Sequence, residues 1–218
     1  MKQSKSSILL TVVSLLLSLT VFSSLPEQIP AHWNVHGTVD RFAPKLTVFI
    51  FPGIIFLITI LFQFMRRTDP NSDNYDKFQR EYHRYTFVIG LVFFAVQIMT
   101  IAAAFRMDFN VNLIFCLGIG SLFIFIGNLL PKTKHNYFIG IRTPWTLADE
   151  QNWFRTHRLA GKIWVLGGLI VALTALAPES FQVPVFLTIL AVMVVTPFVY
   201  SIQSSAKNAE NILCQNRV

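Results

Sequence analysis

Long apolar stretches alternate with short polar ones along the whole chain. The apolar stretches cover approximately residues 8–25, 46–65, 85–105, 111–130, 163–177 and 184–202. A helix needs about 20 predominantly apolar residues to cross the hydrocarbon core of a bilayer. The pattern therefore predicts an all-α, polytopic membrane protein, a six-helix transmembrane bundle with amphipathic interfacial segments in its cytoplasmic loops.

The first apolar stretch has two interpretations. Lys2 and Lys5 precede it, as basic residues precede the apolar part of a secretory signal peptide. No A-x-A-like cleavage site follows, and a run of about 18 residues is long enough to span a bilayer. We expect a retained helix, and cleavage stays open as the alternative.

The polar intervals divide the chain into four parts. Residues 1–65 are predicted to form a helical hairpin with an outer loop at 26–45, and residues 66–84 a cytoplasmic connector. Residues 85–202 are predicted to form a four-span domain with a cytoplasmic loop at 131–162, and residues 203–218 a cytoplasmic tail. In the connector, Tyr75, Phe78, Tyr82 and Tyr85 follow one another at helical spacing. We interpret this stripe as an interfacial helix with its aromatic rings at headgroup level.

The distribution of Lys and Arg predicts the orientation of the spans. With the N-terminus inside, 15 of the 18 basic residues lie in inner segments and only Arg41, Lys45 and Arg106 in outer ones. Cytoplasmic loops carry such an excess of Lys and Arg. We therefore expect both termini in the cytoplasm.

Composition and charge narrow the function. The chain has 218 residues, of which 53% are hydrophobic and 13% charged, against about 25% charged in soluble domains. The net charge is +7. In this topology most of the basic residues face anionic lipid at the inner membrane surface, which accounts for the positive charge, so direct nucleic-acid binding is not expected. The spans contain almost no ionisable residue, which disfavours an ion-coupled transporter. A passive transporter or a lipid-handling protein remains an alternative.

The outer loop contains His32, His36 and Asp40 at intervals of four. On a helix these side chains would share a face and could hold a metal, as in a metal-dependent membrane enzyme. Asn34 and Gly37 are poor helix residues, and Gly37 predicts a turn with positive φ. We expect a compact loop at the outer membrane surface without a bound metal, and keep the metalloenzyme as a second alternative.

The polar interval from Gly127 to Gly161 is the longest between two apolar stretches. Thr146, followed by Asp149, predicts the N-cap of a helix that carries Trp153 and His157. No nucleophile accompanies His157, so we expect neither catalysis nor a cofactor.

Two segments resemble a known family. GNLLPKTKHNYFIGIRTPWTLADEQNWFRTHRLAGKIW resembles the signature of the SdpI family of bacterial membrane immunity proteins. IPAHWNVHGTVDRFAPK resembles the short uncharacterised domain that commonly precedes that signature. The resemblance implies a non-enzymatic plasma-membrane protein that protects its producer against a secreted antimicrobial peptide toxin. It further implies a receptor role, in which a cytoplasmic transcriptional repressor is held at the membrane.

The resemblance and the topology together nominate two groups of residues. The signature loop, expected to dock or signal on the cytoplasmic side, contributes Asn128, Lys132, Asn136, Gly140, Arg142, Thr143, Pro144, Trp145, Trp153, Thr156, His157 and Arg158. The outer loop, expected to meet a toxin arriving from outside, contributes His32, Trp33, Asn34, His36, Gly37 and Asp40. No sequence feature assigns an oligomeric state.

Overall fold

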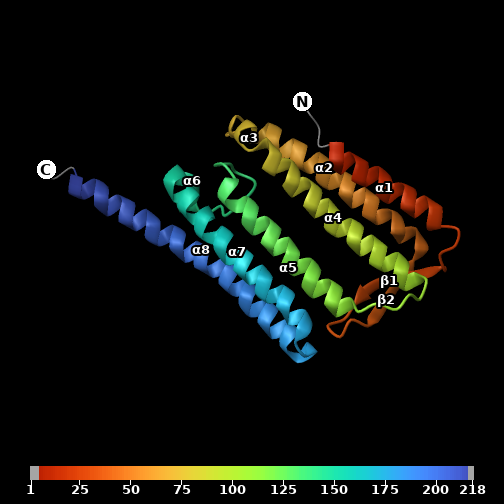
Figure 1. Ribbon diagram of the computed structural model, residues 1–218. Helices are drawn as coiled ribbons and strands as arrows, with labels where there is room; N and C mark the ends of the chain where they lie inside the picture. Colours follow the sequence, from red (N-terminus) through yellow and green to blue (C-terminus); the bar gives the residue numbers. More distant parts are fainter. Residues whose placement is uncertain (1–4, 216–218) are drawn as a thin grey trace. The chain divides into compact units, whose positions relative to one another are not determined.

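The computed structural model describes residues 5–215, with side chains for residues 5–207, and is mostly helical (Figure 1). Its elements are α1 (Lys5–Val21), β1 (Gln28–Trp33), β2 (Val39–Pro44), η1 (Lys45–Phe49), α2 (Ile50–Thr68), α3 (Asn74–Lys77), α4 (Gln79–Ala104), α5 (Val111–Leu129), η2 (Leu130–Lys132), α6 (Pro144–Ala148), α7 (Glu150–Leu173), η3 (Thr174–Leu176) and α8 (Glu179–Gln215). Lys2 and the last three residues of the predicted tail lie outside the described part.

Within residues 5–215, five helical segments are long and apolar enough to cross a membrane. They are Lys45–Thr68, Gln79–Ala104, Val111–Lys132, Glu150–Leu176 and Glu179–Lys207. The sixth predicted span, α1, is apolar but has only 17 residues. The prediction of a multi-pass helical membrane protein is confirmed.

The all-α prediction is wrong in the outer loop, where β1 and β2 form an antiparallel hairpin. Several helix boundaries also differ from the predicted ones. Helix α8 begins at Glu179, so Pro184 lies inside it and not in its first turn, and the helix continues through most of the predicted tail. Helix α7 begins at Glu150, well before the apolar stretch, because a helix can extend into water once its apolar part is anchored.

The chain forms two compact units. One contains the chain up to Arg66 together with Tyr82–Gly118, and the other contains Arg67–Glu81 and the chain from Ile119 onward. Polar residues in the first unit connect its helices. Gln97 of α4 accepts a hydrogen bond from the Ser14 hydroxyl (2.6 Å) and donates to the Ser18 hydroxyl (2.8 Å), and all three side chains are buried. Within a bilayer such groups must be satisfied by the protein itself, so this contact holds α1 against α4.

The hairpin is fixed at its base to the same unit. Ile29 packs in a buried cluster with Leu25, Val48 and Ile101. Lys45 forms an ion pair with Glu27, with 2.9 Å between Nζ and Oε1. The hairpin is therefore anchored at one end of the helices and projects its turn away from this anchor.

In the second unit, α5 and α7 approach each other at glycine residues. A Cβ added to Gly168 would lie 2.6 Å from the Gly120 carbonyl oxygen, and one added to Gly161 would lie 2.7 Å from the Gly127 carbonyl oxygen. Small residues allow such backbone contact between membrane helices. Helix α8 covers another side of α7, where Met193 joins Phe123 and Val171 in a buried cluster.

The aromatic stripe of the connector is buried within the protein and does not face lipid. Tyr75, Phe78, Tyr82 and Tyr85 are each at most 5% exposed. The Tyr82 hydroxyl donates to the Phe62 carbonyl of α2, and the Tyr75 ring packs against Phe78. The prediction of an interfacial stripe is wrong because helical spacing alone does not distinguish a lipid-facing side from a protein-facing one.

The glycine contacts lead to the first prediction. Gly168→Ala places a methyl group against the α5 backbone and is expected to lower the free energy of unfolding by about 1–3 kcal/mol. Gly118 of α5 has no atom within 4 Å of an added Cβ, so Gly118→Ala is the matched control and is expected to leave stability unchanged or slightly raised. Thermal unfolding of the detergent-purified variants measures both, and equal melting temperatures would contradict the proposed packing.

Candidate functional site

The segment between η2 and α6 is a non-helical loop whose backbone is held by buried side chains. Asn136 is fully buried. Its Oδ1 accepts from the backbone N–H groups of Phe138 (2.9 Å) and Ile139 (2.7 Å), and its Nδ2 donates to the carbonyls of Lys134 (2.8 Å) and Ile139 (3.0 Å). One amide side chain thus satisfies four backbone groups that no helix or strand pairs.

Asp69 fixes the connector to this loop. Its carboxylate accepts from the backbone N–H of Asn71 (2.7 Å), from the Tyr75 hydroxyl (2.7 Å) and from the backbone N–H of Tyr137 (2.8 Å). The residue is 4% exposed. Hydrogen bonds to an ionised acceptor are stronger than those between neutral groups, so the carboxylate is well suited to join two segments far apart in sequence.

His135 provides a second connection between the same two segments. Its Nδ1 lies 3.1 Å from Asn71 Nδ2, and its Nε2 lies 3.1 Å from the Leu147 carbonyl oxygen. Asn74 Nδ2 donates to the His135 carbonyl at 2.9 Å. An amide N–H can only donate and a carbonyl only accept, so these contacts fit the neutral ring with its proton on Nε2.

Trp153 and His157 support the loop from α7. The Trp153 indole N–H donates to the Thr133 carbonyl at 2.9 Å, and its ring stacks on His157 with 4.0 Å between centroids. His157 Nε2 accepts from the Ile141 N–H (3.0 Å), while Nδ1 lies 2.8 Å from the Trp153 carbonyl oxygen. Both ring nitrogens are engaged, so this histidine has none free to act as a general base.

Gly140 makes the close approach to His157 possible. Its φ is +116°, in the region that side chains rarely adopt. A Cβ at this position would lie 2.3 Å from His157 Nε2. Glycine is therefore required here both by backbone conformation and by space.

The helix caps differ from those predicted. Thr143, and not Thr146, is the N-cap of α6: its side chain accepts from the Thr146 N–H, and the Thr146 side chain accepts from the Thr143 N–H in a capping box. Pro144 occupies the first turn, where a missing N–H carries no penalty. Asp149 caps α7 by accepting from the Gln151 N–H. The chain thus begins two consecutive helices where the sequence pattern suggested one.

Helix α8 is joined to this site through Ser201. The Thr143 hydroxyl lies 3.0 Å from the Ser201 hydroxyl, and Asn152 Nδ2 donates to the Ser201 carbonyl at 2.8 Å. Thr156 donates to Asn152 Oδ1 at 2.9 Å. The four side chains are buried. The start of α6, the first two turns of α7 and the turn of α8 that contains Ser201 therefore form one hydrogen-bonded group.

The predicted signature residues fall into two groups. Five are buried parts of the loop network, namely Asn136, Thr143, Trp153, Thr156 and His157, and Gly140 belongs with them. The exposed members are Asn128, Lys132, Arg142, Pro144 and Arg158, while Trp145 is half-buried against Phe198. Arg142 reaches the Tyr137 carbonyl at 2.8 Å. The exposed group presents mostly basic side chains at the surface.

Sequence reasoning missed Asp69, Asn71, His135, Asn152 and Ser201 as members of this network. The Asp69-Pro70-Asn71 sequence was recognisable as a turn, but its partner Tyr137 is 68 residues away. Only the tertiary structure shows which polar side chains of the connector meet the loop.

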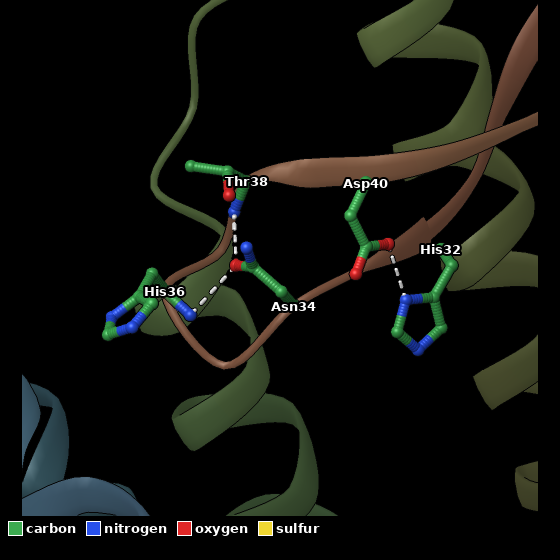
Figure 2. A network of polar contacts seen from close by, with 5 residues as sticks. All are labelled: His32, Asn34, His36, Thr38 and Asp40. Atoms are coloured by element: carbon green, nitrogen blue, oxygen red, sulfur yellow. Dashed lines mark hydrogen bonds and ion pairs between the residues drawn. The ribbon is translucent and has the colours of Figure 1, made fainter.

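The hairpin brings the outer-loop residues together in a different way (Figure 2). His32 Nδ1 lies 2.6 Å from Asp40 Oδ1, and both side chains are exposed. In the turn, Asn34 Oδ1 accepts from the backbone N–H groups of His36 and Thr38. Gly37 has φ +74°, which confirms the predicted turn.

The arrangement of the hairpin does not support the metalloenzyme alternative. His36 points away from the His32–Asp40 pair in Figure 2. Within the described part of the chain, no group of three His, Cys, Asp or Glu side chains is placed to hold a metal ion. Trp33 is half-buried, whereas the exposed surface of the hairpin includes the histidine–aspartate pair, His36, the polar or charged Gln28, Thr38 and Arg41, and the apolar Val35 and Phe42.

Comparisons with known proteins find similarity in the N-terminal and in the C-terminal part of the chain. Residues 132–201 match the SdpI/YfhL protein family, and residues 9–56 match a domain of unknown function, DUF1648. The chain is also 28% identical over 198 residues to the immunity protein SdpI of Bacillus subtilis (strain 168), covering 90% of this chain and 93% of that protein. The resemblance inferred from the two sequence segments is confirmed. At 28% identity, the Bacillus subtilis protein is a distant homologue of this chain. No solved structure matches the chain.

The role of Asp69 can be tested by an isosteric change. Asp69→Asn replaces one carboxylate oxygen by an NH2 group, which cannot accept a hydrogen bond, so the contacts from Asn71, Tyr75 and Tyr137 cannot all be kept. It is expected to lower the free energy of unfolding by about 1–3 kcal/mol. Asp73→Asn, at an exposed position with no side-chain cap hydrogen bond, serves as control with no expected change. Tryptophan fluorescence during thermal unfolding distinguishes the two, and equal stability would show that Asp69 is not a structural link.

The contact between Gly140 and His157 predicts coupling between two substitutions. Gly140→Ala is expected to destabilise the protein, because it combines a strained φ with a clash against the imidazole. His157→Ala also destabilises, since it removes the acceptor of the Ile141 N–H. In the double variant the clash is absent. Its loss of unfolding free energy should therefore be smaller than the sum of the losses in the two single variants by about 0.5–3 kcal/mol. Strictly additive unfolding free energies would contradict the contact.

Proposed function

We propose, from the match of residues 132–201 to the SdpI/YfhL family, that this chain is a membrane immunity protein. In this role it protects the producing bacterium against a secreted antimicrobial peptide toxin, by binding and not by catalysis. The observation that carries the proposal is the extent of the similarity to the Bacillus subtilis immunity protein, which covers 90% of this chain. Such coverage includes both the hairpin and the loop network.

The hairpin is the proposed surface for the toxin. The Lys/Arg distribution predicts that it faces outward. It exposes His32, Asp40 and His36 for hydrogen bonds, and Val35 (66% exposed) and Phe42 (57% exposed) for apolar contacts. A peptide that enters membranes is amphipathic, and a rigid surface with both kinds of group is suited to bind it. The Ile29 cluster and the Lys45–Glu27 ion pair provide the rigidity.

The signature loop is the proposed cytoplasmic surface. Its exposed Arg142 and half-buried Trp145 are of the residue types enriched in protein interfaces, and the exposed Lys132 adds positive charge. The buried members, Asn136 and His157 among them, hold this surface in shape. If the protein also acts as a receptor, this is where a cytoplasmic repressor would dock.

Survival under toxin challenge tests the proposal. The full chain is expressed in a Bacillus subtilis strain that lacks SdpI and is challenged with the secreted peptide against which that protein confers immunity. A second arm uses culture supernatant of the bacterium that encodes this chain. We expect preserved membrane potential and higher colony counts in at least one arm. No protection in either arm, with the protein detected in the membrane, would contradict the immunity function.

Hairpin variants then locate the toxin surface. His36→Ala and Asp40→Asn are expected to lower protection about tenfold each, as the loss of a contact worth about 1.4 kcal/mol would. Ser23→Ala, at an exposed position preceding the hairpin, is the control and should protect like the unmodified chain. Full protection by both hairpin variants would exclude the hairpin while leaving the immunity function itself standing.

A further inference from the structure

Seven exposed residues of α7 form a single stripe along the helix. They are spaced by three or four positions, namely Gln151, Arg155, Arg158, Lys162, Leu166, Leu169 and Leu173. At 3.6 residues per turn, this spacing places all of them on one face. The first half of this α7 stripe is polar and basic, and the second half consists of leucine.

The opposite face of α7 packs inside the unit. Trp153, Thr156, His157 and Ala160 are fully buried there, where two of them hold the signature loop. The α7 stripe therefore faces away from the core of its own unit. Its three leucines are 61%, 46% and 63% exposed, within a helix apolar enough to span a membrane.

Arg158 and Lys162, the two basic residues of the α7 stripe nearest to its leucines, are exposed. Among the described side chains, no carboxylate forms an ion pair with Arg158 or Lys162. Arg155 lies 3.5 Å from the uncharged Gln151 side chain. Asp149, at the start of the helix, is engaged as its N-cap. Arg158 and Lys162 thus present their positive charge to the surroundings.

The distances along α7 match the layers of a bilayer. Lys162 precedes Leu166 by about 6 Å at a rise of 1.5 Å per residue, and Arg155 precedes Lys162 by about 10 Å. With the leucines in hydrocarbon, Lys162 and Arg158 lie within reach of the headgroup layer, which is roughly 5–8 Å thick on each side. Long basic side chains at this depth extend toward the phosphates.

We infer that the α7 stripe is a binding surface for anionic phospholipid, with Arg158 and Lys162 as the groups that contact the headgroup phosphate. The direct continuation of the basic residues into lipid-facing leucines favours lipid over an acidic protein, which would leave the leucine half uncovered. Because Trp153 and His157 lie on the other face of the same helix turns, lipid binding here also sets the depth of the signature loop.

Lipid titration of the purified full-length chain tests the inference. Phosphatidylglycerol or phosphatidylcholine is added in detergent, and bound lipid is counted by native mass spectrometry. The variant combines Arg158→Gln with Lys162→Gln. The matched control combines Arg80→Gln with Arg84→Gln, which removes the same charge from exposed positions of α4. Thermal unfolding in lipid-free detergent verifies that both variants are folded.

The unmodified chain and the control should prefer phosphatidylglycerol, and the α7 variant should bind it about tenfold or more weakly, since each basic residue near an anionic surface contributes about 1 kcal/mol. Phosphatidylcholine binding should not change. Unchanged phosphatidylglycerol affinity in the α7 variant would overturn the inference. The α7 stripe would then be interpreted as a surface for an acidic protein partner. An equal loss in the control would also overturn it, because the effect would then reflect total charge.

Discussion

The second unit depends on satisfying the backbone of a partly buried, non-helical loop beside helices long enough to span a membrane. Unpaired backbone groups are costly where water is scarce, and the loop between η2 and α6 has no strand or helix to pair them. Asn136 satisfies four of these groups, and Asp69, His157 and Trp153 satisfy others. The shape of the loop therefore follows from a few side chains contributed by separate segments.

This constraint changes how the family signature is understood. A residue such as His157 attracts attention as a candidate for chemistry or binding, yet both of its ring nitrogens are used to hold the loop. Gly140 is required by its φ and by its distance to that ring. The residues free to meet a partner are the exposed ones, such as Arg142 and Lys132. In the first unit, Gln97 has a comparable structural role by joining α1 to α4.

Predictions from local pattern succeeded where a single physical property decides the outcome. Apolar length predicted the five helices that are long enough to span a membrane, though the sixth predicted span, α1, is shorter, and Gly37 predicted a turn with positive φ. Predictions failed where two interpretations share one pattern. The spacing of Tyr75 and Tyr82 fits a lipid-facing stripe as well as the buried one observed, and Thr146 fits an N-cap as well as the third position of a capping box begun by Thr143.

The sequence by itself determined that this is a multi-pass helical membrane protein with a turn at Gly37 in its first polar interval and a family signature in a later one, because hydrophobic length, turn residues and motif spacing are local properties. Only the tertiary structure decided that Asp69 meets Tyr137, that Gly140 rests on His157 and that Ser201 joins Asn152. These contacts join positions from 17 to 68 residues apart. Contacts between residues so far apart in the sequence depend on how the helices pack. A local sequence pattern contains no information about helix packing.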